Sequence, residues 1–128
     1  IGKGMMILVG IQADDTAEDI EWLTGKICNL RIFDDENGVM NKSVKEDGGD
    51  ILAVSQFTLM ARVKKGNRPS YIDAARPEIS IPLYELFVKS LGEEMQKEVK
   101  KGVFGADMKV ELINNGPVTI LIDSKNRL

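Results

Sequence analysis

The sequence predicts an α+β domain in which a curled, barrel-like sheet of antiparallel or mixed strands carries two main helices. Two observations predict this class. First, strand-like apolar runs and helix-like patterns alternate along most of the chain. Second, the C-terminal part of the chain has two adjacent strand-like patterns with a turn between them. The chain has 128 residues, of which 43% are hydrophobic and 29% charged, so residues 1–128 are expected to form a single domain.

The N-terminal half begins with a short apolar run at 5–11, which is typical of a strand buried on both faces. Residues 16–30 follow as an amphipathic helix, because Thr16 and Asp19 approximate a capping box and apolar residues recur at helical spacing. The acidic segment 34–38 ends in Asn-Gly and lacks the ligand spacing of a calcium loop. It therefore predicts a hairpin turn rather than a cation site.

The second half begins with another turn. A turn at 46–50 leads into a second buried strand at 51–54, and a short helical turn is predicted at 69–75. A longer helix is predicted from about Ile81 to Val99, with an apolar stripe that belongs to the core. The members of that stripe are Leu83, Leu86, Phe87, Ser90, Leu91 and Met95.

The C-terminal strands, predicted at 109–113 and 118–123, are separated by the turn Asn114-Asn115-Gly116-Pro117. Asn-Gly favours positive φ and Pro fixes φ near −65°, so this turn has little backbone freedom. A second polar interruption, at 55–58, follows the buried strand at 51–54. Because buried polar groups must be hydrogen-bonded, its side chains either close a strand end or line a cavity.

The absence of histidine excludes several chemistries. With no His in the chain, Ser-His-Asp catalysis and nearly all zinc-site patterns are removed. The single cysteine, Cys28, lies on the apolar side of the predicted helix and has no His to activate it, so we expect a buried thiol in a reducing cytoplasm. No apolar run approaches the roughly 20 residues of a membrane span.

Charge is distributed unevenly. The net charge is −3, which argues against general polyanion binding, yet no acidic residue occurs between Ile51 and Ile72. Four basic residues cluster in this interval: Arg62, Lys64, Lys65 and Arg68. They form either a solvated loop or a phosphate-binding loop, and their position just after 55–58 favours the second interpretation.

The two polar segments also carry a resemblance. Residues 55–59 (Ser-Gln-Phe-Thr-Leu) and 114–119 (Asn-Asn-Gly-Pro-Val-Thr) resemble the signature motifs of the D-aminoacyl-tRNA deacylases, also called D-tyrosyl-tRNA(Tyr) deacylases. Three further stretches, 29–33, 65–69 and 104–108, resemble the same family, and all five occur in the family's order.

The resemblance implies a cytoplasmic homodimer that hydrolyses the ester between a D-amino acid, or glycine, and the terminal ribose of tRNA, without a cofactor or metal. Family members begin with a strand carrying a Gln-Arg pair and then a hairpin, so N-terminal strands are expected to be missing from this chain. By position, the catalytic segment is Ser55, Gln56, Phe57 and Thr58. Gly116 and Pro117, joined by a cis bond, form a chirality gate that enters the partner's pocket. Phe104 and Asn114 are substrate-binding candidates, and Arg62, Lys64, Lys65 and Arg68 are tRNA-binding candidates.

Two mechanisms for the ester hydrolysis are compatible with these residues. In one, the Thr58 hydroxyl is a nucleophile, although no base is available to activate it. In the other, which we favour, backbone N–H groups near Phe57 and Thr58 bind the oxyanion and the ribose 2′-hydroxyl assists. Phe104 either stacks on the terminal adenine or is a core aromatic residue. The alternative function is a non-catalytic nucleic-acid-binding module of the DNA-unwinding-element type.

Overall fold

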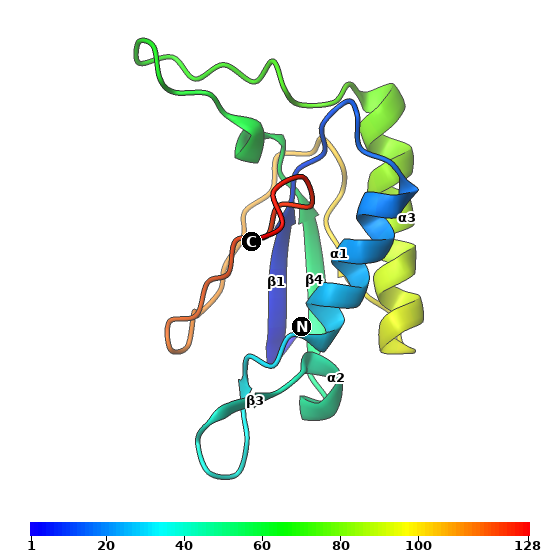
Figure 1. Cartoon of the computed structure of the whole chain (residues 1–128), viewed down its shortest axis with the longest axis vertical. Helices are drawn as coiled ribbons and strands as arrows, with labels where there is room; N and C mark the ends of the chain where they lie inside the picture. Colours follow the sequence, from blue (N-terminus) through cyan, green and yellow to red (C-terminus); the bar gives the residue numbers. More distant parts are fainter.

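Two successive strand–helix units form the centre of the molecule in the computed structural model, which describes residues 1–128 (Figure 1). The first unit is β1 (Gly4–Val9) followed by α1 (Ala17–Asn29). The second is β4 (Asp50–Ser55) followed by α3 (Pro77–Met95), after which β5 (Lys100–Lys101) returns to the sheet. The three strands form one sheet in the order β1-β4-β5, and both pairings are parallel.

The α+β class is confirmed. The main sheet, predicted as a curled, barrel-like sheet of antiparallel or mixed strands, has parallel pairings and forms no closed barrel. A helix separates each strand from the next in this sheet, and a chain that crosses over through a helix re-enters the sheet in parallel. The register places Gly4 opposite Asp50 and Val9 opposite Ser55. A Cβ atom at Gly4 would lie 1.9 Å from the carbonyl oxygen of Asp50, so this pairing requires glycine.

Four short elements complete the secondary structure. The strands β2 (Phe33–Asp34) and β3 (Met40–Lys42) pair antiparallel around a turn in which Gly38 has φ +72°, which confirms the hairpin predicted at 34–38. The helix α2 (Val44–Asp47) occupies part of the predicted turn at 46–50. A single 3-10 turn, η1 (Phe57–Met60), follows β4 directly. The structure thus contains more helical elements than the two main helices predicted.

The helix α1 matches its prediction because its cap is encoded locally. The Thr16 amide donates to the Asp19 carboxylate at 2.9 Å, as in a capping box. The helix α3 begins at Pro77 rather than near Ile81, with proline in the first turn and Pro82 inside the helix. Residues 69–75 form no helix; a turn closed by Ala74 N to Tyr71 O (3.0 Å) replaces it. None of the helices is both long and apolar enough to cross a membrane.

The core lies between the sheet and the two long helices, which Figure 1 shows on one side of β1 and β4. From α3, Phe87, Leu91 and Met95 are buried, which confirms the core role of the predicted stripe. The Tyr84 hydroxyl lies within hydrogen-bond distance of two carbonyl oxygens, those of Ala53 (3.1 Å) and Gly102 (3.2 Å), and shares its one proton between them. It so connects α3 to β4 and to the segment after β5.

The C-terminal segment corrects a second prediction. Residues 109–113 and 118–123 form no hydrogen-bonded strands. An alternating sequence can make a strand only where a neighbouring backbone completes the ladder, and these residues have no such neighbour within this chain. Ile113 and Leu121 consequently leave 93% and 89% of their surface exposed.

The end of the chain packs against α1 through charged groups. The Lys125 ammonium contacts Asp19 Oδ2 at 3.0 Å and Asp15 Oδ1 at 3.7 Å. Two residues on, the Arg127 guanidinium carbon lies 4.3 Å from the ring centroid of Trp22. These contacts attach the C-terminal end of the chain to α1. Figure 1 shows the C-terminus near the middle of the molecule.

Candidate active site

The carboxyl ends of β1 and β4 lie side by side because the two strands are parallel and in register. The last ladder pair is Val9 and Ser55, and the Gln56 amide then donates to the Val9 carbonyl at 2.8 Å. Directly afterwards η1 turns the chain away from the sheet. Ligands of open parallel sheets usually bind beyond this edge, where loops diverge from the strand ends.

A cavity of about 530 Å³ occupies this edge. Its walls come from the ends of β1 and β4, the start of α3, and the segments 71–75 and 104–110, and they are mainly apolar. The polar or aromatic lining residues are Ser55, Gln56, Phe57, Tyr71, Ser80, Phe104 and Asp107. A mostly apolar cavity with a few polar groups is the usual form of a small-molecule site.

Three of the four predicted catalytic residues, Ser55, Gln56 and Phe57, line this cavity. Thr58 does not; its hydroxyl oxygen instead accepts a hydrogen bond from the Gln56 side-chain amide. The first backbone donor inside η1 is Leu59, which bonds the Gln56 carbonyl at 3.2 Å. The amides of Phe57 and Thr58 precede it, and the first amides of a helical turn have no acceptor within that turn.

Two aromatic residues form part of the cavity wall. Phe57 is 57% exposed and meets Tyr71 edge-on, with ring centroids 5.0 Å apart. Phe104 lines the same cavity and also packs against the core, with its ring centroid 5.8 Å from that of Tyr84. The two interpretations offered for Phe104, a ligand-facing ring and a core aromatic residue, are therefore compatible.

The turn at 114–117 lies outside the cavity of its own chain, since Asn114, Gly116 and Pro117 are absent from its walls. The Gly116–Pro117 peptide bond is cis, as the resemblance implies. Gly116 has φ +144°, which L side chains rarely adopt. The Asn114 side chain stabilises the turn: its Oδ1 accepts a hydrogen bond from the Val118 backbone amide at 2.9 Å, and its Nδ2 donates to the Thr119 hydroxyl at 2.9 Å.

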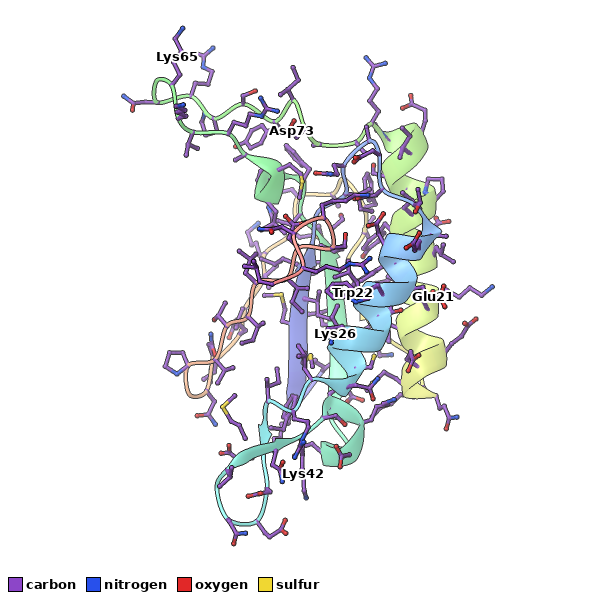
Figure 2. The ribbon with its side chains drawn as sticks, in the orientation of Figure 1. Glu21, Trp22, Lys26, Lys42, Lys65 and Asp73 are labelled. Carbon is purple, nitrogen blue, oxygen red and sulfur yellow. The ribbon has the colours of Figure 1, made fainter.

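The basic cluster lies on a loop that projects from the body of the molecule, and Figure 2 shows Lys65 at its far end. The backbones of Arg62 and Ser70 exchange hydrogen bonds of 2.8 and 3.0 Å at its base. There the Arg62 guanidinium also pairs with Asp73, at 2.5 and 2.7 Å, and this contact raises the pKa of Arg62. Lys64, Lys65 and Arg68 form no ion pair.

Among the polar or aromatic lining residues, sequence reasoning missed three: Tyr71, Ser80 and Asp107. Asp107 belongs to a stretch that carried the family resemblance, which could have marked it, whereas nothing local distinguishes Ser80 from other polar helix residues. The prediction that Cys28 is a buried thiol is confirmed. Its side chain is fully buried, and burial raises the pKa of the thiol to about 11, with a smaller contribution from Glu94.

The structure defines a small α+β protein with a cavity at the carboxyl edge of a parallel sheet, which makes this edge the candidate site. The family model described as "D-Tyr-tRNA(Tyr) deacylase" matches residues 1–123. Curated proteins called D-aminoacyl-tRNA deacylase are 72% identical in Bacteroides fragilis and 68% identical in Bacteroides thetaiotaomicron; each match covers 99% of this chain and 85% of the relative. The chain belongs to the D-Tyr-tRNA(Tyr) deacylase family, which confirms the resemblance.

Two solved structures are also similar. One, titled "c-Myc DNA Unwinding Element Binding Protein", has a TM-score of 0.86 and 42% identity, over 94% of this chain and 81% of that chain. The other, titled as a probable eukaryotic D-amino acid tRNA deacylase, has a TM-score of 0.70 over 81% of this chain and 76% of that chain. Its 19% identity supports the fold alone.

Proposed function

We propose that this protein is a D-aminoacyl-tRNA deacylase: it hydrolyses the ester that joins a D-amino acid, or glycine, to the terminal ribose of tRNA. The observation that carries this proposal is the family match over residues 1–123, combined with a cavity lined by Ser55, Gln56 and Phe57. Its substrate is aminoacylated tRNA, and we place its action in the cytoplasm, where charged tRNA is used.

Backbone groups and the substrate would perform the chemistry. Ester hydrolysis requires an attacking water, stabilisation of the oxyanion and transfer of a proton. The amides of Phe57 and Thr58, at the start of η1, are the proposed oxyanion donors; such donors contribute about 3 to 4 kcal/mol to lowering a barrier. The ribose 2′-hydroxyl assists the proton transfer. In this proposal Thr58 is not the nucleophile; in support, its hydroxyl accepts a hydrogen bond from the Gln56 side chain and contacts no basic side chain that could take its proton.

A homodimer would complete the site. The turn at 114–117 lies outside its own cavity, and exposed Ile113 and Leu121 flank it, so a partner subunit would cover these apolar side chains. In the proposed arrangement the Gly116 and Pro117 carbonyls enter the partner's cavity and leave no space for an L side chain. Selection then depends on a clash, and glycine passes the gate.

One assay tests the activity. Equal concentrations of D-Tyr-tRNA, L-Tyr-tRNA and Gly-tRNA are incubated with the protein, and loss of the ester is followed. We expect hydrolysis of the D-Tyr and Gly esters and little loss of the L-Tyr ester. Absence of D-Tyr-tRNA hydrolysis by a folded protein would refute the proposed function.

The gate is tested separately with Gly116→Ala and Pro117→Ala. At Gly116 a Cβ would lie 2.9 Å from Val118 Cγ2, and its φ of +144° already disfavours alanine. Both variants are expected to lose activity or to accept L-Tyr-tRNA. Unchanged rates and unchanged D-over-L selectivity in both would refute the gate while leaving the deacylase proposal intact.

A second candidate function is binding of nucleic acid without catalysis, which the 42% identity to the protein titled as a DNA-unwinding-element-binding protein favours. The projecting loop with Lys64, Lys65 and Arg68 would serve either function. The two candidates differ in one outcome: a pure binder retains DNA or tRNA on a filter and leaves every aminoacyl ester intact.

A further inference from the structure

The turn at 114–117 stands in the middle of an arm, residues 109–121, which Figure 1 shows in orange projecting from the body of the molecule. The arm is held at its two ends. At the first end Met108 packs closely on Gly102, where an added Cβ atom would lie 2.5 Å from the Met108 sulfur. At the second end Ile122 is half-buried against the core. Between these ends the backbone makes no hydrogen bond to another segment, so the two ends set the position of the turn.

Lys125 strengthens the second end. Its ammonium contacts Asp19 Oδ2 at 3.0 Å, Asp15 Oδ1 at 3.7 Å and the carbonyl oxygen of Asp14 at 3.3 Å. No other lysine of the chain contacts two carboxylates. The Asp19 and Asp15 side chains are only 9% and 14% exposed, so salt screens these contacts less than it screens those of surface pairs.

The backbone to which Lys125 is attached also builds one wall of the cavity. Asp15 Oδ2 accepts a hydrogen bond from the Gln12 amide at 2.8 Å, and Gln12 forms a bridge with Ala74. The neighbouring Ile11 carbonyl accepts from the Ala75 amide at 2.8 Å. Ile11, Ala74 and Ala75 all line the cavity. The C-terminal tail, residues 122–128, is therefore attached to a part of the molecule that hydrogen bonds hold in place.

We infer that Lys125 is a positioning residue: by attaching the tail to the start of α1 it holds the arm, and with it the gate residues Gly116 and Pro117, in place. The inference rests on the proposed function and its gate. Selection by a clash requires that the clashing groups cannot move aside. Productive sites hold such groups within about 0.5 Å, and the arm has no ladder of its own to provide this. The specificity of the gate then depends on a side chain outside the cavity.

The first test compares three lysine variants. Lys125→Met removes the charge, and Lys125→Arg keeps it. Lys3→Met is the matched control, because Lys3 also pairs at 3.0 Å with a largely buried carboxylate, that of Asp47, and neither residue belongs to the arm or lines the cavity. We expect the ratio of kcat/KM for D-Tyr-tRNA to that for L-Tyr-tRNA to fall about tenfold or more in Lys125→Met, since small displacements of positioning groups have effects of this size. Lys125→Arg and Lys3→Met should keep the ratio of the unmodified protein.

The second test follows the arm without any ester. A nitroxide is attached to Glu111→Cys, an exposed position of the arm, while fully buried Cys28 stays unlabelled. We expect the electron paramagnetic resonance spectrum of the label to become more mobile when Lys125→Met is added, and to stay constant when Lys3→Met is added.

Each test can overturn the inference by itself. In folded Lys125→Met, an unchanged ratio of D-Tyr to L-Tyr hydrolysis would show that the gate does not depend on Lys125. An unchanged label spectrum would show that Lys125 does not hold the arm. The proposed function fails separately, if the unmodified protein leaves D-Tyr-tRNA intact; the label spectrum would then still decide whether Lys125 positions the arm.

Discussion

Thr58 is the residue at which the two candidate mechanisms differ most clearly. Its hydroxyl accepts a hydrogen bond from the Gln56 side chain and does not line the cavity, and no basic side chain is positioned to remove its proton. A hydroxyl without a base is a poor nucleophile. The geometry therefore favours a role for the backbone of this segment over a role for the side chain.

We predict that Thr58→Val, which keeps the shape and removes the hydroxyl, retains D-Tyr-tRNA deacylation within about tenfold of the unmodified rate. Loss of a true nucleophile costs roughly a thousandfold or more. Single-turnover rates under saturating enzyme measure this directly, with Thr58→Ser as the control that keeps the hydroxyl. A thousandfold loss in the valine variant with an unchanged melting curve would assign the chemistry to the side chain.

Tyr84 offers a stability prediction at the same scale. Removing its hydroxyl in Tyr84→Phe deletes a hydrogen bond whose one proton is shared between the main-chain carbonyls of Ala53 and Gly102. We expect the free energy of unfolding to fall by about 0.5 to 1.5 kcal/mol, the usual contribution of one such bond. Urea unfolding measures the loss. Tyr71→Phe is the control, since the exposed Tyr71 hydroxyl bonds nothing in the chain, and a similar loss in both variants would contradict the prediction.

Among the elements, the helices and the buried strands were predictable because their signals are local. The capping box at Thr16 and Asp19 and the apolar spacing after it define α1, and the apolar run at 51–54 defines β4. The C-terminal strands were not predictable in this way. A strand depends on hydrogen bonds to a neighbouring backbone as much as on its own alternation, and residues 109–113 and 118–123 make none.

Some residues of the candidate site could likewise be predicted from local sequence, and others could not. The turn at 114–117 and the segment 55–58 could be recognised as motifs, and three of the latter's residues do line the cavity. Asp107 and Ser80 reach the cavity only through a chain reversal at Gly105 and through the start of α3 at Pro77. The position of these two side chains in the cavity depends on tertiary structure, and the spacing of residues along the chain does not predict it.

The contact between the C-terminal segment and α1 leads to a pH prediction. Burial acts to raise the pKa of Asp19, but hydrogen bonds from the Thr16 amide and from Lys125 outweigh it, so the folded-state pKa lies below 3.8. A carboxyl group with a lowered folded-state pKa stabilises the fold above its unfolded pKa and loses that contribution as the pH falls through the folded value. The neighbouring Asp15, whose pKa burial raises, acts in the opposite direction.

Lys125→Met should therefore be less stable than the unmodified protein at pH 7, and the difference should shrink as the pH falls below 3.8, where Asp19 takes up a proton. At the alkaline end, the pKa of Lys125 is raised above 10.5 by its hydrogen bond with Asp19, so the difference should persist to that pH and vanish beyond it. Urea unfolding across this range measures it. A difference independent of pH would show that Lys125 acts through packing alone.

At the scale of the whole molecule, the charge distribution bears on the tRNA binding that we propose. The net charge of −3 repels a polyanion, so the projecting loop is where phosphates would be attracted. Arg62 is already neutralised by Asp73, which leaves Lys64, Lys65 and Arg68. The loop extends beyond the rest of the body (Figure 1), as a contact with a long ligand outside the cavity would require.

Replacing Lys64, Lys65 and Arg68 together by alanine should weaken tRNA binding and reduce the slope of log K against log salt by about two to three, since each phosphate contact contributes roughly 0.7 to 0.9. Filter binding between 50 and 200 mM salt, the range used for such slopes, is the measurement. Lys89→Ala, on the exposed side of α3, is the control. An unchanged slope in the triple variant would exclude the loop from the tRNA interface.

Because Arg127 packs against Trp22, the intrinsic fluorescence of the protein reports the position of the C-terminal tail. Trp22 is the only tryptophan of the chain, so intrinsic fluorescence arises from a single indole that the C-terminal tail covers. Arg127→Ala should move the emission maximum to longer wavelength while the far-ultraviolet circular dichroism stays constant; an identical emission spectrum would mean that the tail does not rest on α1 in solution. Since the same tail continues from the segment that bears Gly116 and Pro117, any movement of that segment when aminoacyl-tRNA binds could be followed optically, without a label.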